Sequence, residues 1–154
     1  MTTPAVRTRP RALALTALAA ALMWATAACE DGSPAAKVND PAWQEPSSYT
    51  YTLESSEGER SLIGRFEVTV RGGEVVKSVG LDEAGRRLVD RRPEEVPTIG
   101  ELLDEAEAAR KDDADKVEIT YASDGHPTRI CLDWEENAVD DEALYAITGY
   151  AATG

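Results

Sequence analysis

Hydrophobic and polar side chains alternate along much of the chain after residue 47, which is the pattern of β-strands with one buried face. The alternation defines six segments: 49–53, 62–71, 74–81, 117–121, 128–134 and 144–150. In the second segment, Phe66, Val68 and Val70 alternate with charged or polar residues. The pattern predicts an antiparallel sheet of about five to six strands whose hydrophobic positions face one core.

The turn between the second and third segments consists of two glycines, Gly72 and Gly73. Glycine accepts the positive φ angles of a two-residue type I′ turn. A strict turn of this kind would place Lys77 opposite Val68 on the core face of the sheet. We therefore expect either a β-bulge that shifts the register or a face that is only half covered.

One segment, 98–111, has the spacing of a helix. Its hydrophobic positions form a single stripe: Ile99, Leu102, Leu103 and Ala106. Thr98 and Glu101 have the spacing of a capping box, in which each side chain accepts a hydrogen bond from a backbone N–H. The charged residues 82–95 are interpreted as an exposed connection with a short strand at 87–90. One helix (about 98–111) packed on one face of the sheet predicts the α+β class.

The start of the chain shows neither the alternation of a strand nor the hydrophobic stripe of an amphipathic helix. Arg7, Arg9 and Arg11 precede an uncharged stretch, 12–28, which is marginal in length for a membrane span. A basic start followed by a short apolar run is typical of a secretory signal peptide. The alternatives are an ordinary signal peptide cleaved after the Ala-x-Ala triplet 25–27 and an uncleaved membrane anchor.

Cys29 favours a more specific interpretation. Ala27 and Ala28 precede it, and small residues before a cysteine resemble the lipobox of bacterial lipoproteins, although Thr26 stands where leucine is usual. In those proteins the cysteine sulfur takes a diacylglycerol and the chain is cut just before it. The expected organisation is a signal peptide (1–28), a flexible tether with lipidated Cys29 (29–46) and one domain (47–154). The lipid bilayer is then a partner through the acyl anchor, and the protein lies at the outer face of the cell membrane.

The net charge of the chain limits which other classes of partner it can bind. The chain has 16 basic and 29 acidic residues and a net charge of −13, which falls to −16 if the three arginines of the signal peptide are removed. Such a surface repels phosphate backbones, so we expect no nucleic-acid partner.

An acidic stretch near the end of the chain is the candidate for cation binding. It holds six carboxylates: Asp133, Glu135, Glu136, Asp140, Asp141 and Glu142. Carboxylate oxygens suit hard cations such as Ca²⁺. Counted from Asp133, however, Ala138 stands where a calcium loop has glycine and Leu144 where it has glutamate. A solvated loop is therefore the favoured interpretation, and a cation site is the alternative.

Nucleophilic chemistry has little support in the sequence. If Cys29 is acylated, Cys131 is the only remaining thiol, so no intramolecular disulfide forms. His126 is the only histidine, and no third group that would activate a Cys–His pair is evident. Cys131 is interpreted as a structural residue, and we expect no catalytic residue and no cofactor.

Six short pieces carry a family resemblance through their order and spacing: PSSYTY (46–51), VTVRGGEVV (68–76), PTIGEL (97–102), DGHP (124–127), DW (133–134) and DDE (140–142). Together they resemble the DUF6174 family of bacterial lipoproteins, from about Trp43 to Tyr150. The resemblance implies an exported protein and lends no activity, because the function of that domain is unknown. Many relatives carry Cys-x-Cys where this chain has Ser55, Ser56 and Glu57, so no role of that pair carries over.

The sequence thus predicts an envelope-anchored domain that binds another envelope protein or component without catalysis. Two alternatives remain: an enzyme that uses carboxylates the sequence does not identify, and a cation-responsive module built on residues 133–142.

Overall fold

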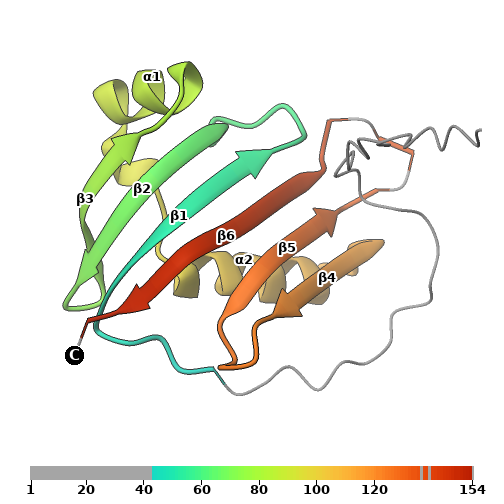
Figure 1. Ribbon diagram of the computed structural model, residues 1–154. Coiled ribbons are helices and arrows are strands. Elements are labelled where there is room, and N and C mark those ends of the chain that lie inside the picture. The colour runs from blue at the N-terminus through green and yellow to red at the C-terminus, as the bar shows by residue number, and fades with distance from the viewer. Residues whose placement is uncertain (1–42, 136, 139, 154) are drawn as a thin grey trace, which may run out of the picture.

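The computed structural model describes residues 43–135, 137–138 and 140–153. Within these residues, one six-stranded sheet carries two α-helices and a 3₁₀ turn (Figure 1). The strands are β1 (Ser48–Ser56), β2 (Gly64–Arg71), β3 (Glu74–Gly80), β4 (Lys116–Tyr121), β5 (Pro127–Asp133) and β6 (Ala143–Ala152). The helices are α1 (Glu83–Arg91), η1 (Pro93–Glu95) and α2 (Ile99–Lys111).

The sheet is antiparallel throughout, with the spatial order β3-β2-β1-β6-β5-β4. The chain therefore builds one half of the sheet from β1, β2 and β3. It then crosses through the helices and completes the other half by placing β6 next to β1. This order leaves β3 and β4 as the two terminal strands.

The prediction of the α+β class is wrong, because the architecture is close to all-β and helices make up only 23% of it. The helix expected at about 98–111 is present as α2, but the described chain has a second α-helix. Residues 83–91 form α1, so the exposed connection and short strand expected there are wrong as well. The Asp82 carboxylate caps α1 by accepting a hydrogen bond of 2.7 Å from Gly85 N. This helix buries only Gly85 and Leu88, because its apolar positions at helical spacing are few and small and lie among charged residues.

The hairpin of β2 and β3 contains the bulge that the two-glycine turn required. Arg71 pairs with Glu74, but the register shifts after Thr69, so that Lys77 pairs with Thr69 and Val68 faces Ser78. One extra residue on β3 thus moves Lys77 from the core face to the solvent face.

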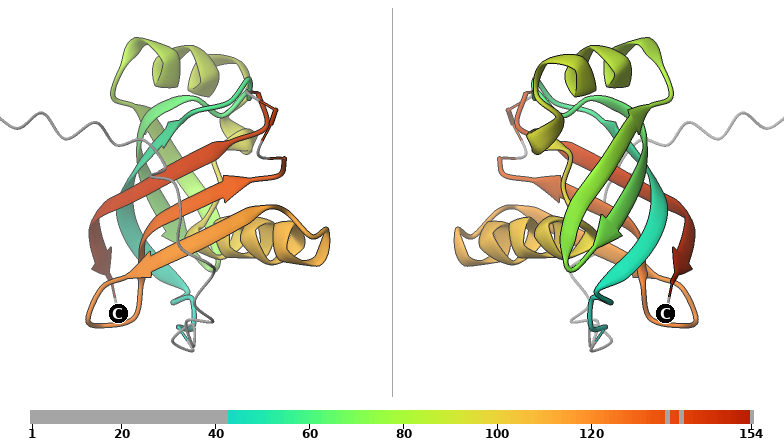
Figure 2. Two further views of the ribbon diagram at one scale, coloured as in Figure 1. Left: turned by 90° about the vertical axis from the view of Figure 1, so that its right-hand side faces the viewer. Right: turned by 90° about the vertical axis from the view of Figure 1, so that its left-hand side faces the viewer.

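The two faces of the sheet are not covered equally by helices. Figure 2 shows α2 crossing one face beside β4 and β5, whereas α1 lies at the end of β2 and β3. The core between the sheet and α2 contains the large inward side chains of the strands, as their alternation predicted: Tyr49, Tyr51, Leu53, Phe66, Val68, Val70, Ile130, Leu132, Tyr145 and Ile147.

The hydrophobic stripe of α2 is buried as predicted, except for one of its four residues. Ile99, Leu102, Ala106 and Ala109 are buried, whereas Leu103 is only half-buried at the edge of the core. The expected capping box is present, since Thr98 and Glu101 each accept a hydrogen bond from the other's backbone N–H. None of the helices in the described part of the chain has the length and apolarity that a membrane span requires.

Candidate binding groove at the edge of the sheet

Within the part of the chain that the structure describes, no strand pairs with the outer edge of the terminal strand β3. Its last residue, Gly80, is closely covered by α1, because a Cβ at this position would lie 2.1 Å from Arg86 N. Helix α1 therefore protects the end of β3 but leaves its beginning open. An open edge presents backbone N–H and C=O groups that no neighbouring strand satisfies.

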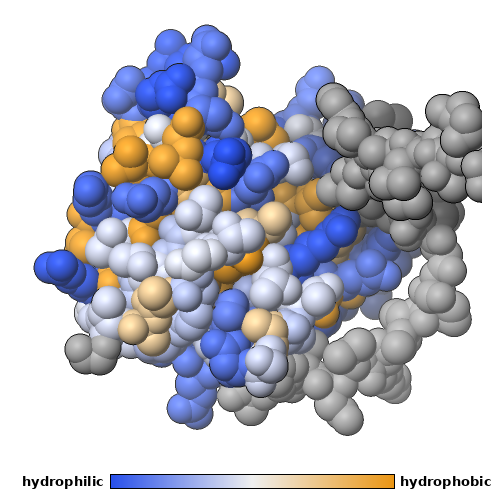
Figure 3. All heavy atoms as spheres, viewed as in Figure 1, coloured by the Kyte–Doolittle hydropathy of each residue, from blue (hydrophilic) through white to orange (hydrophobic). Residues whose placement is uncertain are grey.

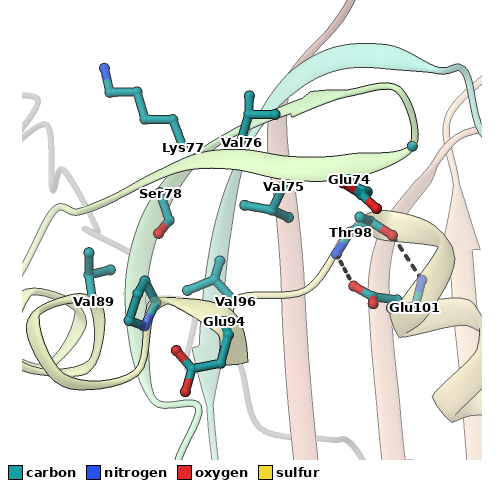
Figure 4. Close-up of a pocket in the computed structure, with 12 residues that line it drawn as sticks. Glu74, Val75, Val76, Lys77, Ser78, Val89, Glu94, Val96, Thr98 and Glu101 are labelled. Atoms are coloured by element: carbon teal, nitrogen blue, oxygen red, sulfur yellow. Dashed lines mark hydrogen bonds between the residues drawn. The ribbon is translucent and has the colours of Figure 1, made fainter.

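A cavity of about 540 Å³ runs along this open part of β3 (Figure 4). Residues 73–78 form one wall, and side chains from α1, η1 and the start of α2 form the other. We call this cavity the β3 groove. Val75 points into it from the strand and Val96 from the opposite wall, while Val89 and Pro93 extend the apolar lining.

The charged residues of the β3 groove are mostly acidic. Glu74, Glu94 and Glu101 line it, and among the described residues Lys77 is the only basic one that does so. Figure 4 shows the Lys77 side chain directed away from the cavity, so the other charged side chains along it are acidic. The Glu101 carboxylate also accepts a hydrogen bond of 2.7 Å from Thr98 N, which fixes the wall at the start of α2.

Exposed hydrophobic side chains cluster on the other face of the same strand. Three large hydrophobic residues are exposed among the described residues: Val76 at 55%, Leu81 at 43% and Val79 at 37%. All three belong to β3 or follow it directly. Figure 3 shows hydrophobic surface gathered over β3 below α1, while much of the rest of the sheet face is polar. We call these residues the β3 strip. Clustered apolar exposure marks interaction surfaces more often than scattered exposure does.

With this geometry established, comparison with protein families gives one match, to a family of unknown function over residues 36–152. The chain belongs to the DUF6174 family. Neither the curated proteins nor the solved structures contain a match. The resemblance carried by the short sequence pieces is thereby confirmed at the level of the family, which assigns no activity to the β3 groove.

The acidic stretch of this DUF6174 domain packs against the turn between β1 and β2. Glu59 N donates a hydrogen bond of 3.1 Å to Asp140 O, and a Cβ on Gly58 would lie 2.2 Å from Glu142 O. Glu135 and Asp140 are exposed, whereas Asp133, Asp141 and Glu142 are half-buried. Glu136 lies outside the described residues. Among the residues that are described, no three His, Cys, Asp or Glu side chains gather in a way that would hold a metal ion.

A cluster of aromatic and charged side chains lies at the same turn between β1 and β2, and no sequence motif predicts it. The Arg60 guanidinium forms an ion pair with Glu105 of α2 and lies 5.4 Å from the Trp134 ring centre and 5.6 Å from that of Tyr145. The Tyr145 hydroxyl donates a hydrogen bond of 2.8 Å to Glu105. Burial, together with the Glu105 charge, raises the pKa of Tyr145, so its hydroxyl remains a donor at physiological pH. The cluster joins the β1–β2 turn to α2 and to the end of β5.

A second aromatic cluster lies where the chain enters the sheet. Trp43 contacts the Tyr150 ring edge-on with 6.4 Å between ring centres, and His126 stacks on the same ring at 4.3 Å. The His126 Nδ1 atom lies 2.5 Å from an Asp124 carboxylate oxygen. His126 is therefore occupied in a structural turn beside Tyr150, at the far end of β6 from the segment that pairs with Cys131.

Cys131 lies on β5 opposite Leu144 and Glu118 and is 2% exposed. Its sulfur is disulfide-bonded in this structure, whereas the lone thiol was expected only on the condition that Cys29 is acylated. Cys29, the residue predicted to carry the lipid, lies outside the described residues.

Proposed function

We propose that this protein is an envelope-anchored lipoprotein whose DUF6174 domain binds a partner along β3 and has no catalytic activity. The observation that carries the binding role is the coincidence of three features on one strand. Among the described residues, β3 has an edge that no strand covers, a groove with apolar and acidic lining on one face and exposed hydrophobic side chains on the other. Each feature alone is common at protein surfaces, but together they mark one strand as an interaction site.

The energetics favour an interaction of moderate strength. Complete burial of a valine or leucine side chain contributes roughly 1.5–3 kcal/mol. The residues of the β3 strip are already half covered, so a partner that buried all three would gain a few kcal/mol from them before the cost of association is counted. Additional affinity has to come from the groove and from backbone hydrogen bonds.

The anchor rests on the lipobox-like sequence before Cys29. A sulfur that forms a thioether with a diacylglycerol cannot also form a disulfide, and the chain has two cysteines. Lipidation of Cys29 and a disulfide between the two cysteines of the chain are therefore mutually exclusive. Mass spectrometry of the denatured, unreduced protein distinguishes the two states. The mass of a diacylglycerol adduct is expected from the lipoprotein, and the loss of two hydrogens without such an adduct is expected from a chain whose two cysteines are joined.

Site-specific photo-crosslinking in intact cells tests the binding role. A benzoylphenylalanine replaces Val76, which is exposed on β3, and in the control it replaces Glu118, which is exposed on the opposite terminal strand β4. We expect a discrete crosslinked product from position 76 and none from position 118. The absence of any product from position 76, or the same products from both positions, would contradict a binding site on β3.

A further inference from the structure

We infer that the ligand of the β3 groove is an extended peptide segment of another protein, which adds to β3 as a further antiparallel strand, the orientation of every strand pair in this sheet. This inference rests on the proposed function, because it names the shape and chemistry of the partner that the groove binds. Strand addition to an exposed sheet edge is a common mode of peptide recognition, in which backbone hydrogen bonds give affinity and side-chain pockets give specificity.

The shape of the site selects a strand over other ligands. Successive side chains of a strand point to opposite faces of the sheet. A strand beside β3 would therefore place every second side chain in the β3 groove, against Val75 and Val96, and the others over the β3 strip at Val76 and Val79. A helix or a small molecule in the groove would leave the β3 strip uncovered.

The open length of β3 sets the length of the peptide. The groove wall covers residues 73–78, after which α1 approaches the strand at Gly80. At about 3.3 Å per residue, six residues span about 20 Å. A segment of about six or seven residues would fill this length, and a longer strand would meet α1 at one end.

Charge favours a basic segment. Glu74, Glu94 and Glu101 line the groove, and the whole chain has a net charge of −13. A lysine or arginine next to an apolar inward-facing residue would lie against these carboxylates. The same charges disfavour a second copy of this chain as the occupant. Complete antiparallel overlap of two β3 strands would also place Lys77 directly opposite Lys77.

Lys77 and the bulge beside it restrict which strands can pair. Both are devices by which sheets discourage indiscriminate pairing at an open edge. On β3 the lysine lies between Val76 and Val79 on the outer face, so it repels a partner that carries a positive charge at that position. The expected segment is therefore basic on its groove side and uncharged or acidic on its outer side.

The inference is tested with fluorescein-labelled heptapeptides and the purified full-length protein in detergent micelles. The parent probe has the sequence Lys-Thr-Val-Thr-Val-Thr-Lys, so its lysines and valines share one face and its threonines the other. Two further probes carry N-methyl groups on either the odd-numbered or the even-numbered amides. N-methylation removes the hydrogen-bond donor and blocks pairing only on the side where the methyl group points.

Fluorescence anisotropy should show binding of the parent probe and of one N-methylated isomer, with about tenfold or greater loss for the other isomer. Replacing the terminal lysines by glutamates should weaken binding, most strongly at low salt. The protein variant Glu74→Lys with Glu94→Lys should also weaken binding of the parent probe. The matched control is Glu118→Lys with Glu135→Lys, which makes the same charge change on β4 and in the loop after β5.

The outcomes separate this inference from the proposed function. Equal binding of both N-methylated isomers would exclude strand pairing. Failure of all probes, while position 76 still gives a crosslinked product in cells, would likewise overturn the peptide strand and leave the binding site on β3 intact. Absence of that crosslinked product would instead overturn the proposed function itself.

Discussion

The carboxylate of Glu45 accepts a hydrogen bond from the backbone N–H of Gly100, with 3.1 Å between Glu45 Oε1 and Gly100 N. The same oxygen accepts a hydrogen bond from the Tyr49 hydroxyl, which in turn accepts one of 2.9 Å from Ile99 N. The first turn of a helix has N–H groups without partners in the helix, and it carries a partial positive charge. Glu45 therefore supplies an acidic cap to α2 from a segment that precedes the sheet.

Removal of this cap should destabilise the domain modestly. For Glu45→Ala we expect the free energy of unfolding to fall by about 0.5–1 kcal/mol, because the side chain is exposed and solvent weakens its interaction with the helix. Urea denaturation measures the change, and Gln44→Ala is the control at an exposed neighbour. A larger loss in the control than in Glu45→Ala would refute the capping role.

Arg60 is expected to contribute more than an ordinary surface arginine. Arg60→Ala removes its ion pair with Glu105 and its contacts with two aromatic rings, and we expect a loss of about 1–3 kcal/mol. Arg60→Lys should recover only part of this, since lysine lacks the planar guanidinium. For comparison, Arg65→Ala removes an exposed ion pair of 3.5 Å with Glu54 and should cost about 0.5 kcal/mol or less. Equal losses for Arg60→Ala and Arg65→Ala would show that the cluster adds no stability.

Two adjacent leucines of α2 provide an internal comparison. Leu102 is fully buried against the sheet and Leu103 is half-buried, so Leu102→Ala should cost about 2–5 kcal/mol and Leu103→Ala clearly less. Chemical denaturation of the two variants, with circular dichroism as the readout, tests the orientation of the helix. The reverse order of stability would mean that α2 is rotated by about one residue.

Glu57 gives a prediction for pH dependence. Burial raises the pKa of its carboxyl, and so does the charge of Glu142, while Arg129 and Lys116 oppose the shift. A raised pKa in the folded state means that the ionised carboxylate costs stability, and that this cost disappears as the pH falls through the pKa. Glu57→Gln should therefore stabilise the domain at about pH 7 and have a smaller effect at about pH 4. Thermal unfolding at both pH values measures this, with the exposed neighbour variant Glu59→Gln as control. A stabilisation that grows towards acidic pH would contradict the shift.

The anchor is tested at Cys29. Because the thiol is the group that receives the lipid, Cys29→Ser should release the protein from the membrane fraction or block its processing. Cell fractionation with immunodetection measures the distribution, and Cys131→Ser is the matched control, which should remain in the membrane fraction. Normal cleavage and membrane association of Cys29→Ser would exclude the lipoprotein.

The strands were predictable because burial of one sheet face imposes a period of two on each of them. Residues Phe66, Val68 and Val70 show this most clearly, since all three are fully buried. Helix α1 was not predictable in this way. It buries little beyond Leu88, so its charged sequence has the composition of a loop. The local signals that could have revealed it were the Asp82 cap and the i, i+4 spacing of Ala84 with Leu88.

The candidate site depends on information that no local pattern contains. The exposure of Val76 and Val79 follows from the position of β3 at the end of the sheet, which is decided when β6 pairs with β1 and not with β3. The Arg60 cluster likewise joins residues far apart in the chain through tertiary packing. Sequence alternation fixes which face of a strand is buried, but it does not determine which strand has a free edge.

The entry of the chain into β1 has a mechanical consequence. β1 is a central strand, hydrogen-bonded to β2 on one side and to β6 on the other. A pull on the segment before residue 48 acts along the strand, at right angles to its interstrand hydrogen bonds. Both ladders then resist in shear, and many hydrogen bonds share the force instead of breaking one after another. A domain attached to a surface through this segment would keep its fold when a bound partner is drawn away.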